Sequence, residues 1–128
     1  MPPQLCIPFA GSAARTATGN GDTLDLSKFV RDGFPPMLRV QSDVTAISGT
    51  SASLTVVIED SVDGSTWNTI GTFTAQTTVS RQVIQIALSG VAQAAGFAWP
   101  FNHRRVRARW TISGTNPNIT FSVKAAII

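Results

Sequence analysis

The stretch from Leu54 to Phe73 constrains the fold most, because it has the pattern of a β-hairpin. Apolar residues alternate there with residues that can face solvent, as in a strand with one buried face. These apolar residues are Leu54, Val56 and Ile58. Asp63 and Gly64 follow at a point where a hairpin turn needs a positive φ. A second strand then begins near Trp67, which we expect in the core.

Further segments carry the same period of two, with turn residues between them. They are Asp22–Phe29, Met37–Ile47, Thr78–Leu88, Arg104–Ser113 and Asn118–Ile127. Together with the hairpin they predict an all-β domain, an antiparallel β-sandwich of about seven to eight strands, jelly-roll or immunoglobulin-like. Besides Trp67, we expect Ile58, Trp110 and Phe121 in its core. The sequence favours a short helix only at residues 90–95.

The first 21 residues follow neither period. We therefore expect an extended N-terminal arm over residues 1–21 and a single sandwich domain over residues 22–128. An apolar patch in the arm is framed by prolines and comprises Leu5, Cys6, Ile7 and Phe9. Its side chains suit docking on a neighbouring subunit, and a frayed terminus is the alternative.

One short motif occurs twice. Ala46-Ile-Ser-Gly-Thr50 is echoed by Thr111-Ile-Ser-Gly-Thr115, and a strand in the same register follows each copy after the same gap. This repetition suggests two hairpins with matching turns, packed on opposite sheets. The alternative is that Ser-Gly-Thr turns are simply common in β-proteins.

The chain has little material for catalysis or metal binding. His103 is the single histidine and Cys6 the single cysteine, so a metal site of clustered Cys and His and an internal disulfide are both unexpected. Asp60 and Asp63 are more typical of a turn than of a calcium loop. We expect no enzyme activity and no cofactor. With no recognisable signal peptide and no apolar run of about 18 residues, we expect cytoplasmic synthesis and no membrane span.

The charged feature that needs an explanation is a row of arginines. Only 13% of residues are charged, yet Arg105, Arg107 and Arg109 fall on one face of one strand. A solvated face, or a ladder neutralised by Glu59 or Asp43, is one interpretation. An acidic protein partner is another. Nucleic acid is disfavoured, because lysine is scarce and no aromatic residue interleaves with the row.

A second candidate contact lies in the loop that precedes this strand. It contains Trp99 and Phe101. Such residues either plug the end of a sandwich or form an interface, since aromatic side chains are enriched in interface cores. The sequence leaves both interpretations open.

Several segments together resemble the small virion proteins of tailed bacteriophages. They are Ala-Ala-Arg-Thr-Ala-Thr-Gly-Asn-Gly-Asp (13–22), Ser-Val-Asp-Gly-Ser-Thr-Trp (61–67), Arg-Val-Arg-Ala-Arg-Trp-Thr-Ile-Ser-Gly (105–114) and Ile-Thr-Phe-Ser-Val (119–123). The family includes capsid decoration (cement) proteins and head or tail accessory subunits. The resemblance implies a non-enzymatic β-sandwich on the capsid exterior that binds the major capsid protein, often as a trimer.

The candidate interface residues are then the apolar patch, the aromatic loop and the arginine row, namely Leu5, Ile7, Phe9, Trp99, Phe101, Arg105, Arg107 and Arg109. Two alternatives remain besides a decoration protein. One is a tail or head–tail subunit of the same virion. The other is a carbohydrate- or host-binding module that uses Trp67 or Trp99 as a stacking platform.

Overall fold

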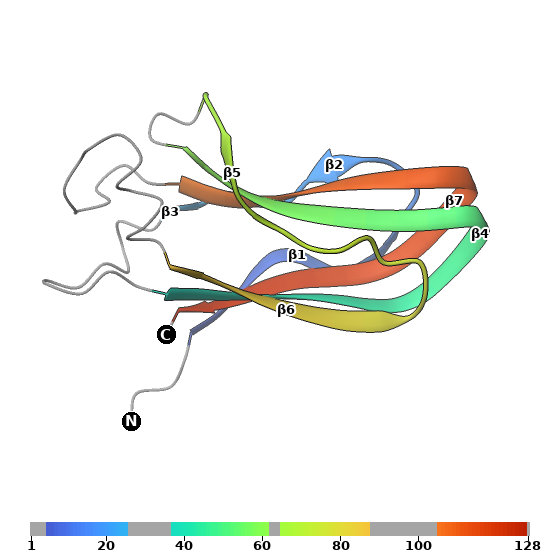
Figure 1. The fold of residues 1–128 in the computed structure, drawn as a ribbon, viewed down its shortest axis with the longest axis horizontal. Helices are drawn as coiled ribbons and strands as arrows, with labels where there is room; N and C mark the ends of the chain where they lie inside the picture. Colours follow the sequence, from blue (N-terminus) through green and yellow to red (C-terminus); the bar gives the residue numbers. More distant parts are fainter. Residues whose placement is uncertain (1–4, 26–36, 62–64, 88–104, 128) are drawn as a thin grey trace, which may run out of the picture.

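The computed structural model describes residues 5–25, 37–61, 65–87 and 105–127. These ranges are all-β and contain no helix (Figure 1). Every strand pairing is antiparallel, and the sheet does not close on itself. The strands are β1 (Leu5–Arg15), β2 (Gly19–Asn20), β3 (Leu24–Asp25), β4 (Met37–Ser61), β5 (Asn68–Thr72), β6 (Ser80–Ala87) and β7 (Arg105–Ile127).

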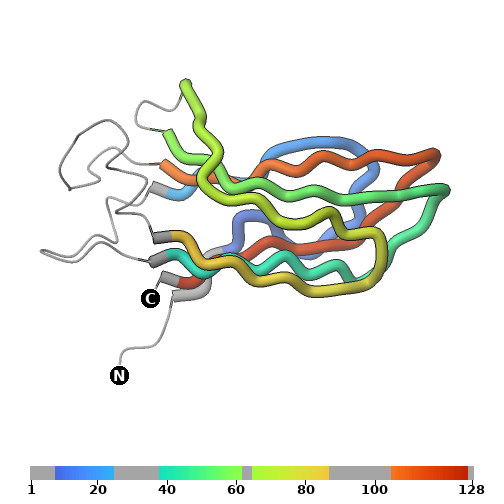
Figure 2. Tube along the Cα trace, in the orientation of Figure 1, coloured from blue at the N-terminus to red at the C-terminus, as the bar shows by residue number. Residues whose placement is uncertain are grey.

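Two long bent strands, β4 and β7, organise the molecule. They pair with each other from Leu38↔Ile127 to Ser61↔Arg105. Both reverse direction at the same end, so their halves lie in two layers (Figures 1 and 2). In one layer β1 and β6 flank them, and in the other layer β5, β2 and β3 do.

The repeated motif lies where β4 and β7 bend. Gly49 and Gly114 have φ angles of 111° and 116°, and both lie at the pairing of Thr50 with Thr115. A Cβ atom on Gly49 would stand 2.6 Å from the carbonyl oxygen of Asn116, so only glycine fits this close approach. The prediction of two separate hairpins was wrong, because the two motifs are one shared bend between paired strands.

This bend also changes the predicted strand boundaries. The single strand β4 contains both predicted strands 37–47 and 54–59. The single strand β7, which begins at residue 105, likewise covers the predicted strands 104–113 and 118–127. The pairing continues through the bend, which a Ser-Gly-Thr turn signal does not reveal. A bulge after Val44 resets the alternation, so Ala46, which an uninterrupted period of two would place on the buried face of Val44, is exposed.

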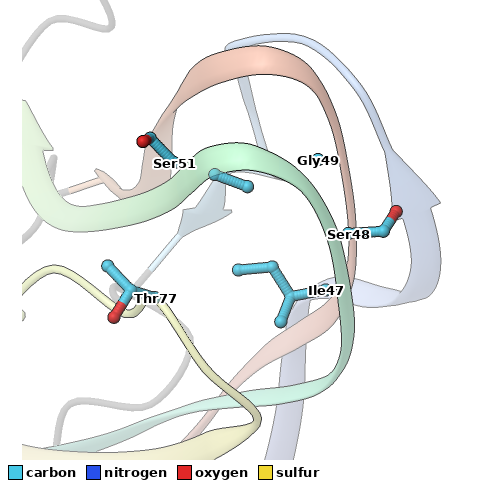
Figure 3. A pocket seen from close by; sticks show the side chains of 6 residues that line it. Ile47, Ser48, Gly49, Ser51 and Thr77 are labelled. Carbon is cyan, nitrogen blue, oxygen red and sulfur yellow. The ribbon is translucent and has the colours of Figure 1, made fainter.

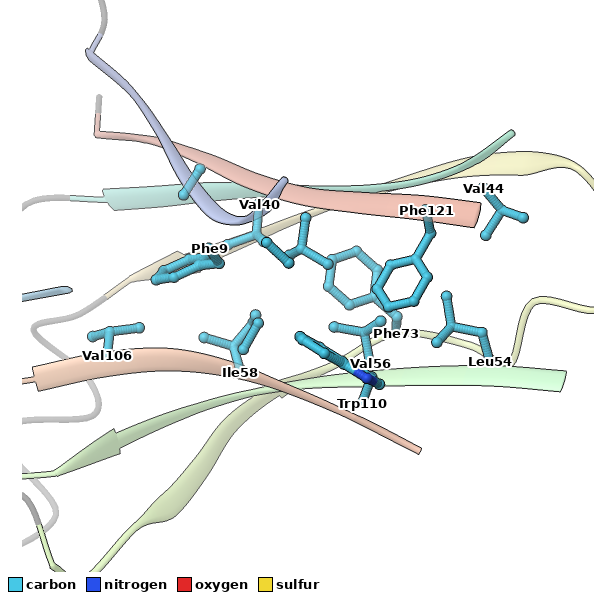
Figure 4. Packing of buried hydrophobic residues seen from close by; sticks show 14 of the residues in the cluster. Phe9, Val40, Val44, Leu54, Val56, Ile58, Phe73, Val106, Trp110 and Phe121 are labelled. Carbon is cyan, nitrogen blue, oxygen red and sulfur yellow. The ribbon is translucent and has the colours of Figure 1, made fainter. Parts of the chain in front are cut away.

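The core fills the space between the two layers (Figure 4). Ile58, Trp110 and Phe121 are buried as predicted. The rings of Trp110 and Phe121 meet edge to face, with centroids 5.3 Å apart. The larger buried side chains come from both layers and include Phe9, Leu38, Val40, Val44, Leu54, Val56, Phe73, Val106, Ile119 and Val123.

The expected N-terminal arm is instead a strand of the domain over part of its length. β1 pairs with the second half of β7, from Leu5↔Ile127 to Arg15↔Ile119. Phe9 is only 1% exposed and belongs to the core. Within the apolar patch, Phe9 is therefore buried in the chain's own core and needs no neighbouring subunit to remove it from water.

The predicted hairpin is confirmed in its two strands. β4 and β5 pair from Val57↔Thr72 to Asp60↔Asn68. Trp67, however, lies outside the core and is only half-buried. The turn at residues 62–64 and the possible helix at 90–95 lie outside the described residues.

Candidate functional site

The candidate site is the outer face of β4, β5 and β7, where the arginine row lies. Glu59 of β4 is paired directly with Arg107 of β7. The Arg107 Nε donates a hydrogen bond of 3.0 Å to Glu59 Oε1. Arg109 approaches the other carboxylate oxygen at 3.9 Å. The Glu59 side chain is only 7% exposed, so a nearly buried carboxylate anchors the row.

An aromatic ring completes this cluster. The guanidinium of Arg107 lies over the Trp67 ring, 4.0 Å from its centroid. No aromatic residue interleaves with the arginines within β7 itself, but Trp67 reaches the row from another element. Trp67 comes from the turn before β5 and not from the strand of the arginines, so the alternation within one strand could not place it there. The stacking and the ion pair together fix the orientation of Arg107.

The three arginines consequently differ in what they offer a partner. Arg107 is 21% exposed and engaged by Glu59 and Trp67, and Arg105 is half-buried. Arg109 is 52% exposed, and its contact with Glu59 is long. Arg107 and Arg109 share the single carboxylate of Glu59, so this cluster of three side chains carries a net positive charge. Arg109 is its most accessible cation.

The outer face of the opposite layer also carries cations. Arg81 of β6 faces Asp43 of β4 across an exposed 3.8 Å ion pair. Arg39 and Lys124 are exposed on the same layer. This face is a useful comparison for the arginine row, because its charges are spread over three strands and Trp67 lies on the other layer.

Arg15 plays a different part from these surface arginines. Its guanidinium lies 4.9 Å from the Trp110 ring centroid and 4.6 Å from that of Phe121. It also donates hydrogen bonds to three backbone carbonyl oxygens, of Gly11, Ala13 and Phe121. Burial lowers the pKa of this guanidinium, which still stays charged at neutral pH. Arg15 therefore fastens β1 to the aromatic part of the core.

A hollow of about 390 Å³ lies beside the bend (Figure 3). Its walls carry hydroxyl and small apolar groups and no ionisable side chain. The lining residues are Ile47, Ser48, Gly49, Ser51, Ala52 and Thr77. This composition offers a ligand only weak polar contacts. The hollow therefore contributes no chemistry comparable with the arginine cluster.

The predicted interface residues of the apolar patch lie away from the arginine row. Leu5 and Ile7 pair with Ile127 and Ala125 in β1, on the other layer. Phe9 is buried in the core and cannot contact a partner. Trp99 and Phe101 lie outside the described residues.

Neither a cluster of metal-ligating side chains nor a membrane-spanning helix is found in the part of the chain that the structure describes. Within residues 5–25, 37–61, 65–87 and 105–127, no three His, Cys, Asp or Glu side chains gather closely enough to hold a metal ion. The same stretches contain no helix long and apolar enough to cross a membrane. Comparison with protein-family models, with curated proteins and with solved structures finds no match.

Proposed function

We propose that this protein is a structural virion protein that binds the outer surface of an assembled phage capsid and stabilises it. The supporting observation is the arginine cluster around Glu59, in which Arg107 is held by Glu59 and Trp67 and Arg109 lies exposed beside it. The sequence resemblance to decoration proteins supplies the kind of partner, the major capsid protein. The protein would be made in the host cytoplasm and act on the capsid exterior, without catalysis or a cofactor.

The geometry suits an orienting contact with acidic side chains of the shell. Arg107 is already fixed by its ion pair and by stacking on Trp67, so little side-chain entropy remains to be lost there. Arg109, beside it, has the exposure to form a charge-assisted pair with a shell carboxylate. Repeated over a lattice, many weak contacts of this kind favour the assembled state, because they bind only that state.

Arg109→Glu is the variant that tests this contact. We expect it to lower occupancy on purified capsids and to leave the fold intact, because the side chain is half exposed and Arg107 still neutralises Glu59 at 3.0 Å. Arg39→Glu is the matched control, since it makes the same charge change on the opposite outer face. Binding of the unmodified protein should also weaken as salt rises, because exposed charges are screened over about 8–10 Å. Equal occupancy of both variants, together with salt-insensitive binding, would contradict the proposal.

Arg107→Glu is a poor test of the same contact. It would place a second carboxylate beside the nearly buried Glu59, in the position of the cation that now neutralises it. Such a buried like-charge pair destabilises the fold. Lost capsid binding would then report unfolding and not the interface.

The alternatives from the sequence differ in measurable ways. A tail or head–tail subunit would be present in few copies per virion, whereas a decoration protein is present in hundreds, so the copy number in purified particles separates them. A carbohydrate-binding module using Trp67 is disfavoured, because Arg107 already occupies one face of that ring. For the fold we propose the finer assignment of a β-sandwich of about seven to eight strands, supported by the two layers and the core between them.

A further inference from the structure

The edge strand β6 is unusually regular. It pairs with β4 over eight successive residues, from Met37↔Ala87 to Val44↔Ser80, without a register shift. Among the described strands, β4 is the one that pairs with it. In an antiparallel pair, alternate residues direct their N–H and C=O groups away from the neighbour, so β6 has a row of these groups facing away from β4.

The other flanking strands differ from β6. β1 has register shifts between Pro8 and Ala10 and between Ala10 and Ala13. β5 pairs with β4 through a further shift next to Glu59. Bulges and prolines are two of the features, besides charged side chains, that protect an edge from pairing with another chain. β6 contains neither over its length.

Apolar exposure is concentrated at the same edge. Val79, just before β6, is 62% exposed, and Val83, in its middle, is 50% exposed. Among the side chains whose burial the structure describes, these two are the exposed large hydrophobic ones. Arg81 lies between them, and its ion pair with Asp43 reduces the repulsion that a charge would give an incoming strand. A regular edge with exposed apolar side chains is a surface suited to strand addition.

The sequence of β6 is complementary to itself about Val83. In antiparallel pairing centred there, Val83 lies opposite Val83 of the second copy. Arg81 lies opposite Gln85, so the two like charges do not meet. On the other face Gln82 lies opposite Ile84. We infer that the occupant of this edge is a second copy of the chain, and that two β6 strands join across a two-fold axis at Val83.

This dimer goes beyond the proposed function and does not depend on capsid binding. It predicts an even-numbered assembly, because a two-fold contact uses the same surface on both copies. The trimer implied by the sequence resemblance would require a different contact. An eight-residue edge is shorter than a standard interface, so we expect association that depends on protein concentration.

Cysteine cross-linking tests the register directly. In a Cys6→Ser background, which removes the single native cysteine, Val83→Cys should form a disulfide-linked dimer on mild oxidation. Arg81→Cys alone should not, because two copies of residue 81 would lie about 13 Å apart, beyond the roughly 7 Å that a disulfide spans. A mixture of Arg81→Cys and Gln85→Cys should form the mixed dimer. Cross-linking of Arg81→Cys as fast as Val83→Cys would refute the register.

A charge exchange at the centre gives an independent test. Val83→Glu and Val83→Arg each place like charges opposite each other and should weaken association by about tenfold. Mixing the two variants should restore a heterodimer, which a misfolded variant could not do. Sedimentation velocity is the measurement. A monomer at every concentration, a trimer, or association unchanged in both variants would overturn the inference.

Discussion

Trp110 and Trp67 lie in different environments, so truncating each of them compares the same change at two sites. Trp110 is 6% exposed and packs edge to face on Phe121, with 78° between the ring planes. Its Nε1 donates a 3.2 Å hydrogen bond to the Ala17 carbonyl oxygen, and Arg15 covers the ring. Trp67 is half-buried and is covered by one guanidinium group. The variants to compare are Trp110→Ala and Trp67→Ala.

The expected losses follow from these contacts. Truncating a buried Trp to alanine costs about 3–5 kcal/mol of unfolding free energy. Because Trp110→Ala also removes the ring contact with Phe121 and the contact with the Arg15 guanidinium, we expect its loss of unfolding free energy near the upper end of this range. For Trp67→Ala, the loss is partial burial and one cation–π contact, together about 1–2 kcal/mol. A domain has only about 5–15 kcal/mol in all, so Trp110→Ala removes a large share.

Urea unfolding followed by far-ultraviolet circular dichroism measures both values without depending on tryptophan fluorescence. Trp110→Phe adds an intermediate case, because it keeps an aromatic ring but loses the hydrogen bond to Ala17. We expect its loss to fall between those of Trp67→Ala and Trp110→Ala. Equal losses for the two alanine variants, or a larger loss at Trp67, would refute the assignment of the buried faces.

Three further changes test the bend, a buried polar contact and the anchor of the arginine row. Gly114→Ala should destabilise the protein by about 1–3 kcal/mol in chemical unfolding, because φ is 116° there and a Cβ would stand 2.8 Å from the Ser51 carbonyl oxygen. The control Gly11→Ala should be near neutral, because no atom lies within 4 Å of the added Cβ. Gln76→Leu should cost about 1–3 kcal/mol in the same assay, because Gln76 is 2% exposed and accepts a 2.7 Å hydrogen bond from a buried serine hydroxyl. Glu59→Gln should lower the melting temperature clearly, because it removes a nearly buried carboxylate from two guanidinium groups. Asp43→Asn should change the melting temperature little, because Asp43 belongs to a more exposed ion pair of 3.8 Å. A neutral Gly114→Ala or Gln76→Leu, or equal shifts at Glu59 and Asp43, would contradict the respective reasoning.

Alternation predicted the strand faces well where strands run without a bulge. Ile58, Trp110 and Phe121 are buried, and the outward direction of the arginine row is correct. The same pattern fails for β1, where two register shifts interrupt the period within a few residues. Because the sequence of β1 has no regular period, it predicts an extended arm, although the strand pairs with β7 and Phe9 is buried.

The candidate site could be predicted only in part. The face of Arg105, Arg107 and Arg109 followed from the period within one strand, and Glu59 was among the residues considered as a neutralising partner. The stacking of Trp67 on Arg107 depends on how the turn before β5 folds over β7. Such a contact between elements distant in the sequence has no signature in the spacing of either one.

The repeated motif gains its meaning from the pairing of its two copies. Ile47 pairs with Ile119 on one side of the bend, and Leu54 with Ile112 on the other, so the register is related by a local two-fold axis. Each glycine packs against the backbone of the opposite strand, and neither strand could bend alone without breaking the pairing. Two adjacent strands that turn at one place face the same steric requirement. The one shared bend of β4 and β7 therefore explains the similar sequences, and no duplicated hairpin is needed to account for them.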